Sequence, residues 1–250
     1  MYNQEYACIY DLLHDDKAYA KEIDFIYRMY FKYTDLELKD MLDIGCGTGN
    51  HLKLMSEKSD EIKILGIDPS PAMIYIARQK EINNTEFIVG ELSKMTLVKC
   101  YELSISLFNV VNHINKLKDL KSFFRSIYYR VQYGGIYIFD CLNGVAATID
   151  APRDREFIKQ IGDETFAISS KCENDLFNSQ FTMQNKMKLG DEIIEYSLEQ
   201  TLWPPRIIID LLEDIGFEIC KICKAFDETR DATKEDYKIS FVVKKPNIIS

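Results

Sequence analysis

The sequence predicts an α/β fold: a doubly wound, mostly parallel sheet of seven strands with a small antiparallel β insertion. Through residues 40–145, short apolar runs alternate with amphipathic segments, which is the pattern of β–α units joined by right-handed crossovers. A glycine-rich turn follows the first apolar run. From residue 150 the pattern changes to period-two alternation, which is typical of antiparallel strands with one face in water.

A helix is expected over residues 16–38, ahead of the first strand. Ala20, Ile23, Ile26 and Tyr30 recur there at helical spacing between charged residues. Strands and helices of the main sheet then alternate. Ser70 is a suitable N-cap for one of these helices, with Pro71 at its first position. In chain order we expect strand 39–45, helix 50–58, strand 61–70, helix 70–80, strand 85–92, strand 101–108, helix 116–131 and strand 134–143.

Residues 150–202 form the expected insertion, with strands at 164–172, 176–189 and 192–203. Gly190-Asp191 suits the hairpin turn between the last two. The main fold then resumes with a helix over 204–215, a stop at Gly216, and strands at 217–226 and 237–245. We therefore expect one domain over residues 1–250 that contains this insertion. In its middle strand the residues predicted to share the buried face are Phe177, Phe181, Met183, Met187 and Leu189.

The composition excludes several classes of function. The net charge is -9 and the pI is near 5.0, and no run of five Lys or Arg occurs, so a nucleic-acid partner is not expected. No apolar run approaches the ~20 residues that a membrane span needs. The N-terminal stretch is acidic and lacks the apolar centre of a signal peptide. Seven scattered cysteines, an odd number, predict reduced thiols and a cytoplasmic protein.

The glycine turn in "MLDIGCGTGNHLKLM", residues 41–55, permits three interpretations. A phosphate loop of the G-x-x-x-x-G-K-[ST] type is excluded because no lysine follows Gly49. A dinucleotide site of the G-x-G-x-x-G type has Gly45 and Gly47 but meets Asn50 at the third glycine position. The third interpretation is a nucleoside ligand that carries positive charge.

Asp43 favours the third interpretation. It stands two residues before Gly45, where it would repel a pyrophosphate but attract the ammonium and sulfonium of S-adenosylmethionine. The glycines let the main chain approach the ligand without a Cβ. Asp68 ends the second strand, where a carboxylate can accept both ribose hydroxyls.

With these features the sequence resembles the class I S-adenosylmethionine-dependent methyltransferases, which have a Rossmann-like fold. "LDIGCGTGN" is similar to the family's first motif and "GIDPSPAMIYIAR" to its second. The resemblance implies S-adenosyl-L-methionine as cofactor and S-adenosyl-L-homocysteine as product. The cofactor-binding residues it implies are Tyr19, Asp43, Gly45, Cys46, Gly47, Gly49, Asp68, Pro69, Met73, Gly90, Glu91, Leu92, Leu107 and Phe108.

Two residues are candidates for the catalytic chemistry. A base is needed only if the nucleophile arrives protonated, and His113, just past the fourth strand, has an ordinary pKa near ~6.5 that suits this task. The alternative is a loop histidine that only hydrogen-bonds the main chain. Tyr10 lies in the Tyr-rich segment 1–38, which we expect to be a helical lid over the cofactor; the alternative is that Tyr10 and Tyr19 only pack. His51 is expected to be exposed, and no metal site is expected, the Cys220-x-x-Cys223 pair included.

"YDLLHDDKAY", "SLFNVVNHI" and the late insertion together resemble the nucleotide-linked aminosugar N-methyltransferases. This narrower resemblance implies a small polar acceptor, with the amino group of a nucleotide-linked sugar favoured, no membrane or nucleic-acid partner, and a monomer or homodimer. Three alternatives stay open: a small-molecule O-methyltransferase, a non-catalytic S-adenosylmethionine-binding protein, and an NAD oxidoreductase.

Overall fold

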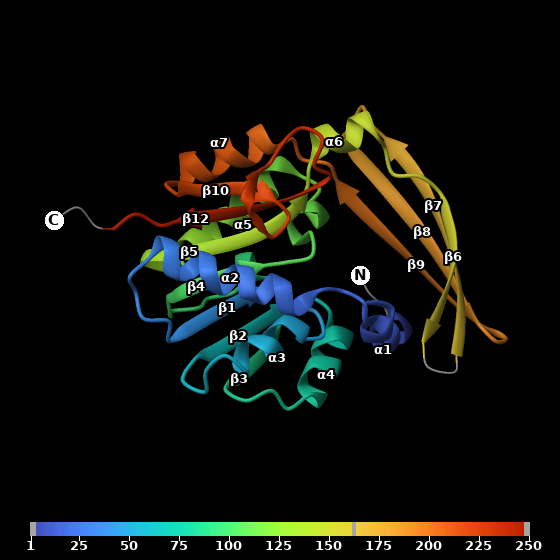
Figure 1. The fold of residues 1–250 in the computed structure, drawn as a ribbon, viewed down its shortest axis with the longest axis horizontal. Helices are drawn as coiled ribbons and strands as arrows, with labels where there is room; N and C mark the ends of the chain where they lie inside the picture. The colour runs from blue at the N-terminus through green and yellow to red at the C-terminus, as the bar shows by residue number, and fades with distance from the viewer. Residues whose placement is uncertain (1–3, 162–163, 248–250) are drawn as a thin grey trace.

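The computed structural model describes residues 4–161 and 164–247 and contains two sheets (Figure 1). The main sheet has eight strands in the order β11-β10-β12-β5-β4-β1-β2-β3. Strands β3, β2, β1, β4 and β5 run parallel, and β12, β10 and β11 extend the sheet antiparallel to its neighbours. The bounds are β1 Asp40–Ile44, β2 Lys63–Asp68, β3 Thr85–Val89, β4 Tyr101–Ser106, β5 Val131–Leu142, β10 Glu218–Lys224, β11 Asp227–Asp231 and β12 Lys238–Lys244.

All seven strands expected for the main sheet are present, and the doubly wound α/β fold is confirmed. The eighth strand, β11, was not predicted. Its sequence DETRD has no apolar residue, and it is held by main-chain pairing to β10 at the sheet edge. The count of seven was therefore wrong by one edge strand.

Helices cover both faces of the main sheet, as a doubly wound fold requires. On one face, α2 (Tyr19–Tyr33), α3 (Asn50–Ser56) and α4 (Pro71–Gln79) bury apolar side chains against alternate residues of the central strands. On the other face, α5 (Leu117–Tyr128) and α7 (Pro205–Ile215) pack against the intervening residues. Ser70 caps α4 and Gly216 ends α7 in the left-handed region, both as predicted.

The N-terminal segment contains two helices rather than one helix over 16–38. Helix α1 spans Gln4–Leu13, and a turn closed by the Lys17 N–H donating to the His14 carbonyl separates it from α2. Helix α2 ends where Thr34 becomes extended, at φ -143°. One face of α1 packs on Met73 of α4, while Ile9 and Leu13 pack on the second sheet. Helix α1 therefore lies between the main domain and the second sheet (Figure 1).

The second sheet is antiparallel, in the order β6-β7-β8-β9, and extends away from the main domain (Figure 1). Its strands are β6 Arg155–Ile161, β7 Glu164–Asp175, β8 Gln180–Leu189 and β9 Glu192–Thr201, and the short helix α6 (Gly144–Ile149) leads into it. Neither β6 nor α6 was predicted. In β8, Phe181 and Met187 are buried as expected, but Phe177 is 96% exposed because it lies in the turn before the strand.

None of the helices in the described ranges combines the length and the hydropathy that crossing a bilayer requires.

Candidate functional site

The glycine turn joins β1 to α3 and has three residues at positive φ: Gly45 at 81°, Gly47 at 56° and Gly49 at 80°. A Cβ on Gly45 would lie 2.5 Å from a methyl group of Val110, and one on Gly49 would lie 3.0 Å from the Phe87 ring. A Cβ on Gly47 would meet nothing within 4 Å. The turn therefore packs tightly at Gly45 and Gly49 and has open space at Gly47.

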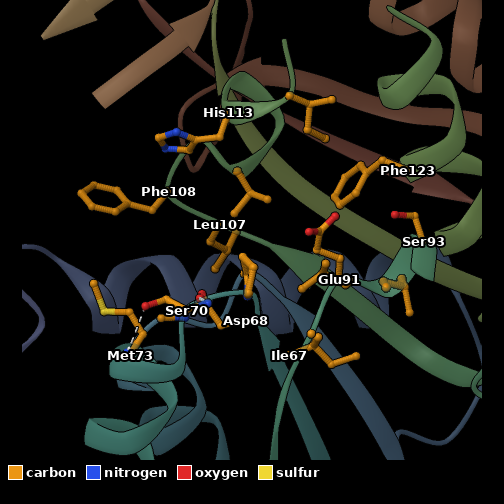
Figure 2. Close-up of a pocket in the computed structure, with 18 of the residues that line it drawn as sticks. Ile67, Asp68, Ser70, Met73, Glu91, Ser93, Leu107, Phe108, His113 and Phe123 are labelled. Atoms are coloured by element: carbon orange, nitrogen blue, oxygen red, sulfur yellow. Dashed lines mark hydrogen bonds between the residues drawn. The ribbon is translucent and has the colours of Figure 1, made fainter. Parts of the chain in front are cut away.

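Asp68, at the end of β2, is fixed to this turn by two main-chain hydrogen bonds. The Gly47 N–H donates to its Oδ2 at 2.9 Å, and the Ser70 N–H donates to its Oδ1 at 2.8 Å. Burial raises the pKa of the Asp68 carboxyl, and these two hydrogen bonds lower it in part. The Ser70 hydroxyl accepts from the Met73 N–H and so fixes the start of α4 beside the aspartate (Figure 2).

A cavity of about 720 Å³ lies at the carboxyl ends of the parallel strands, where open α/β sheets bind their ligands (Figure 2). It brings together most of the residues that the sequence pointed to, from five separate segments of the chain. These are Tyr10, Gly45, Gly47, Asp68, Pro69, Met73, Gly90, Glu91, Leu92, Leu107, Phe108 and His113. Ser197, Leu198 and Glu199 of β9 complete the wall from the second sheet.

Four of the predicted cofactor-binding residues do not line this cavity: Tyr19, Asp43, Cys46 and Gly49. Gly49 packs on Phe87, as described above. The Cys46 side chain faces Gly66 in the sheet, and burial raises the pKa of its thiol. The Tyr19 ring lies edge-on to His51, 4.9 Å between centroids, and burial raises the pKa of its hydroxyl to about 12. These four residues lie outside the cavity lining, and their role in holding the cofactor stays a prediction.

Asp43 is 1% exposed, behind the glycine turn. Burial raises the pKa of its carboxyl well above the ordinary range, the charge of Asp68 raises it further, and Lys17 lowers it in part. Its Oδ1 atom has no hydrogen-bond partner among the described residues. A buried acceptor without a partner costs free energy in the fold, and such atoms in native proteins call for an explanation.

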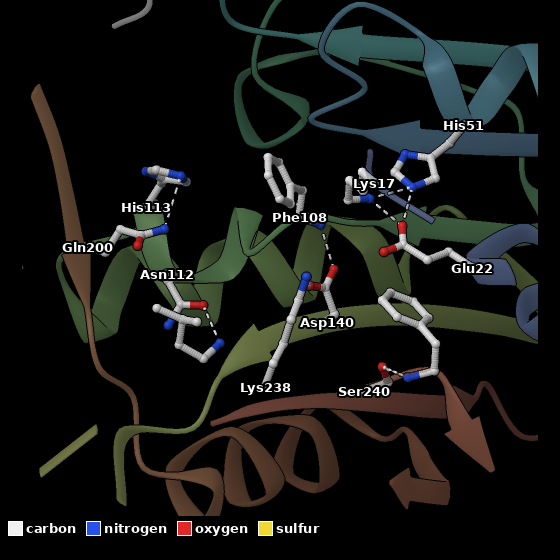
Figure 3. Close-up of polar contacts among 12 residues, drawn as sticks. Lys17, Glu22, His51, Phe108, Asn112, His113, Asp140, Gln200, Lys238 and Ser240 are labelled. Carbon is white, nitrogen blue, oxygen red and sulfur yellow. Dashed lines mark hydrogen bonds and ion pairs between the residues drawn. The ribbon is translucent and has the colours of Figure 1, made fainter. Parts of the chain in front are cut away.

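A buried ion cluster that the sequence did not predict is made of Lys17, Glu22 and His51 (Figure 3), and the charge of Lys17 acts on Asp43. Glu22 accepts a hydrogen bond from Lys17, and its Oε2 lies 2.6 Å from His51 Nε2. His51 is 7% exposed, so the expectation of an exposed histidine was wrong. Burial lowers the pKa of His51, and Glu22 raises it in part. The Lys-Ala-Tyr sequence after α1 gave no signal for this cluster, because His51 lies 34 residues further along the chain.

Phe108 follows β4 in the left-handed region, φ 67°, and so does Asn109, φ 62°. Non-glycine residues rarely adopt this conformation unless the surroundings hold them there. The Phe108 N–H donates to Asp140 Oδ1 at 2.6 Å, and Lys17 and Lys238 place their Nζ atoms 4.9 and 5.3 Å from the ring centroid (Figure 3). These contacts hold the Phe108 ring on the cavity wall.

His113 lies in the 3-10 turn η2 (Val110–His113) and faces the second sheet. Its Nε2 lies 3.3 Å from Gln200 Nε2, and the main chain of Glu199 hydrogen-bonds its ring. Burial lowers the pKa of His113, so the imidazole is neutral at pH 7. Its neighbour Asn112 is fully buried: its Nδ2 donates to the Thr201 carbonyl at 2.8 Å, and its Oδ1 accepts from the Leu142 N–H at 2.9 Å. Asn112 thus ties the loop that carries His113 to both sheets.

Tyr10 reaches the cavity from α1. Its ring lies 4.6 Å from His14 and 6.3 Å, edge-on, from Phe108. Glu91 lies on the far wall, and its Oε1 accepts from Lys94 Nζ at 2.8 Å. Among the described residues no group of three or more His, Cys, Asp or Glu is placed to hold a metal ion.

Residues 41–135 match the family described as "methyltransferase domain". The chain is 36% identical over 93 residues to a malonyl-(acyl-carrier protein) O-methyltransferase of Acetivibrio thermocellus, with 36% of this chain and 33% of that protein covered. It is 25% identical over 142 residues to a dTDP-3-amino-3,4,6-trideoxy-α-D-glucopyranose N,N-dimethyltransferase of Streptomyces venezuelae, with 56% of this chain and 58% of that protein covered. The chain therefore spans less than two thirds of either relative.

Two solved structures share the fold over nearly the whole chain. One is an S-adenosylmethionine-dependent methyltransferase of Clostridium acetobutylicum, with a TM-score of 0.82, 20% identity and coverage of 97% of this chain and 98% of that one. The other is a sugar N-methyltransferase of a Streptoalloteichus species, with a TM-score of 0.77, 18% identity and coverage of 95% and 93%. These likenesses extend the shared fold to the second sheet, beyond residues 41–135.

Proposed function

We propose that the protein transfers a methyl group to an amino group of a small polar acceptor, with a sugar nitrogen favoured. The premise is that residues 41–135 match a methyltransferase domain and that the chain has the fold of the class I S-adenosylmethionine-dependent enzymes. The observation that carries the proposal is the buried carboxyl of Asp43, whose Oδ1 has no partner among the described residues. Such an oxygen suits the ammonium of an amino-acid ligand, whereas a pyrophosphate would be repelled.

In this proposal, other cavity residues contact the ribose and the adenine ring of the cofactor. Asp68, fixed by Gly47 and Ser70, accepts the ribose hydroxyls. Met73, Leu92 and Leu107 supply apolar wall for the adenine ring. When bound, S-adenosylmethionine supplies a methyl group on a positively charged sulfur. The open space over Gly47 lets the ligand approach the main chain.

His113 and Tyr10 are the residues we propose for the acceptor. His113 is neutral at pH 7 and lines the cavity, so it is able to take a proton from an amine that arrives protonated. Tyr10 offers a hydroxyl from α1, which we propose acts as the lid. Much of the acceleration in such a transfer comes from holding the nucleophile at attack distance in a dry pocket.

The relatives support two acceptor chemistries. The Streptomyces venezuelae relative is named for N,N-dimethylation of a nucleotide-linked aminosugar, which supports a nucleotide-linked sugar nitrogen here. The Acetivibrio thermocellus relative is named as an O-methyltransferase, which supports an oxygen acceptor as the second candidate. We place the reaction in the cytoplasm, because all seven cysteines are free thiols, and we propose a monomer or homodimer.

Calorimetric titration with S-adenosylhomocysteine tests the cofactor assignment. We expect binding to the wild type and weakening by about 10- to 100-fold in Asp43→Asn and in Asp68→Asn, since each removes a charge-assisted hydrogen bond. Burial raises the pKa of the Asp43 carboxyl and a bound ammonium lowers it, so we expect binding to weaken as the pH falls, which repeating the titration over a pH series measures. Asp60→Asn, on an exposed loop, is the matched control. Binding of NAD with no binding of S-adenosylhomocysteine would overturn the proposal, and turnover on amino and hydroxyl acceptors separates its two candidates.

A further inference from the structure

The residues that line the cavity carry acidic side chains and, within the described lining, no Lys or Arg. Four carboxylates are present, on Asp68, Glu91, Asp119 and Glu199. Asp68 is held by the glycine turn at the cofactor end, and Glu91 is paired with Lys94. A cavity of this charge attracts cations and disfavours phosphates and carboxylates at close range.

Glu199 is a carboxylate that lines the cavity together with His113. It lies on β9, and its Oε1 accepts from Asn115 Nδ2 at 2.7 Å. Asn115 Oδ1 in turn accepts from the Thr201 hydroxyl at 3.2 Å, so the amide is held between two residues of the same strand. The main chain of Glu199 hydrogen-bonds the His113 ring. The carboxylate of Glu199, held by Asn115, and the imidazole of His113, held by the Glu199 main chain, therefore both line the end of the cavity formed by the second sheet.

We propose that Glu199 binds the protonated amine of the acceptor beside His113 and thereby selects an amine over a hydroxyl or an acid; this inference rests on the proposed function. The acceptor nitrogen is positively charged when it enters. After its proton has passed to His113, its lone pair forms the N–C bond while the C–S electron pair leaves with sulfur, and the nitrogen is positive again. A carboxylate next to the nitrogen stabilises it at the start and at the end of this sequence.

A consequence concerns the phosphates of a nucleotide-linked acceptor. The described lining offers them no cationic side chain, so the diphosphate of such an acceptor lies outside the cavity and contributes little to binding. Recognition then depends on the amine, and a free aminosugar binds nearly as tightly as its nucleotide-linked form.

The test is a calorimetric comparison of four ligands at saturating S-adenosylhomocysteine: 3-amino-3-deoxyglucose and glucose, each free and linked to dTDP. The proteins are the wild type, Glu199→Gln and the control Glu195→Gln. Glu195 lies on the same strand, is exposed, pairs with Lys186 at 3.0 Å and does not line the cavity. We expect the wild type and Glu195→Gln to prefer the amino ligand by about tenfold or more, and Glu199→Gln to lose this preference. We also expect dTDP to change the affinity by less than about threefold.

The possible outcomes separate failure of this inference from failure of the proposed function. Unchanged affinity of Glu199→Gln for S-adenosylhomocysteine shows that the variant is folded. An amino-to-hydroxyl preference that survives in Glu199→Gln overturns the inference, as does failure of the wild type to bind either amine. In both cases the cofactor assignment stands. Absence of S-adenosylhomocysteine binding to the wild type overturns the proposed function, and this inference with it.

Discussion

His113 lies in a short turn that hydrogen bonds hold to both the main sheet and the second sheet. Asn112 anchors the turn to β5 and β9, and the ring of His113 contacts Gln200 and the main chain of Glu199. The sequence left two roles open for His113, a base or a histidine that only hydrogen-bonds the main chain, and the hydrogen bond to the main chain is present. The role as base remains a proposal, and it requires the acceptor nitrogen to take the place of Gln200, whose Nε2 lies 3.3 Å from His113 Nε2.

His113→Ala separates these roles. We expect kcat to fall by about 10² to 10⁴-fold, the usual contribution of a positioned base, with the Kd for S-adenosylhomocysteine unchanged. The lowered pKa adds a pH signature, because only the neutral imidazole accepts a proton. The wild-type kcat should stay level above the ordinary histidine value of 6.5 and fall as the pH drops through the lowered pKa. The role of His113 as base is contradicted if kcat is unchanged in His113→Ala, or if the variant shows the same fall of kcat at low pH as the wild type.

Sequence reasoning found single residues where a local motif fixes their surroundings. Asp68 and the glycines of the turn fall into this class, because strand, turn and helix are contiguous there. It failed for His51, which the motif places on α3 but which is buried by Lys17 and Glu22 from the N-terminal segment. Contacts between distant segments of the chain leave no periodic signal, so the ion cluster could not be predicted.

The glycine turn, taken as one element, has a structural part and a ligand-facing part. We expect Gly45→Ala to destabilise the fold by about 2 kcal/mol or more, because its Cβ would lie 2.5 Å from Val110 and its φ is 81°. We expect Gly47→Ala to lower the free energy of unfolding by only about 1 kcal/mol, from backbone strain, since its Cβ meets nothing. We also expect the ratio of lost S-adenosylhomocysteine affinity to lost stability to be larger for Gly47→Ala than for Gly45→Ala.

Urea unfolding and calorimetry on the two variants measure these effects. Equal loss of stability at both positions would show that the positive φ, and not the neighbouring side chain, sets the cost. Unchanged ligand affinity in Gly47→Ala would show that the ligand does not approach the turn at that point.

Elements with a strong apolar pattern were predicted, and elements without one were missed. The five parallel strands and α2, α3, α4, α5 and α7 all bury a continuous stripe or run of apolar side chains. Strand β11 is entirely polar, and β6 keeps Phe157 and Ile158 exposed, so both depend on ladder hydrogen bonds that a single segment does not reveal. Phe177 belongs to the same class of error, since alternation continued past the residue where the strand begins.

At the scale of the molecule, α1 joins the two sheets. Its apolar residues contact Met73 on one side and Phe166, Ile168 and Met187 on the other. Lys159 of β6 reinforces the junction: its Nζ donates to the Leu13 carbonyl at 2.7 Å and pairs with Asp15 and Asp16 at 2.6 and 2.9 Å. The lid that we propose is thus attached to the second sheet at the C-terminal end of α1.

We expect Lys159→Ala to loosen this attachment without unfolding the protein. A partly exposed ion pair contributes about 1 kcal/mol or less, so hydrogen exchange of the α1 amides should become about fivefold faster while the main sheet is unaffected. Hydrogen exchange by mass spectrometry over residues 4–17 measures this. Lys171→Ala, exposed on the neighbouring strand β7, is the control. Equal exchange rates in the two variants would mean that the apolar contacts of α1 alone hold it in place.

The order in which the cavity wall is assembled along the chain has a further consequence. Ser197, Leu198 and Glu199 come from a hairpin beyond residue 135, whereas the glycine turn and Asp68 lie within the matched stretch 41–135. The cavity wall is therefore built from separate stretches of the chain: residues 41–135 carry the glycine turn, Asp68 and His113, and β9 adds the part contributed by the second sheet. Under the proposed function, substitutions on β9 would change the acceptor side of the cavity without touching the glycine turn or Asp68.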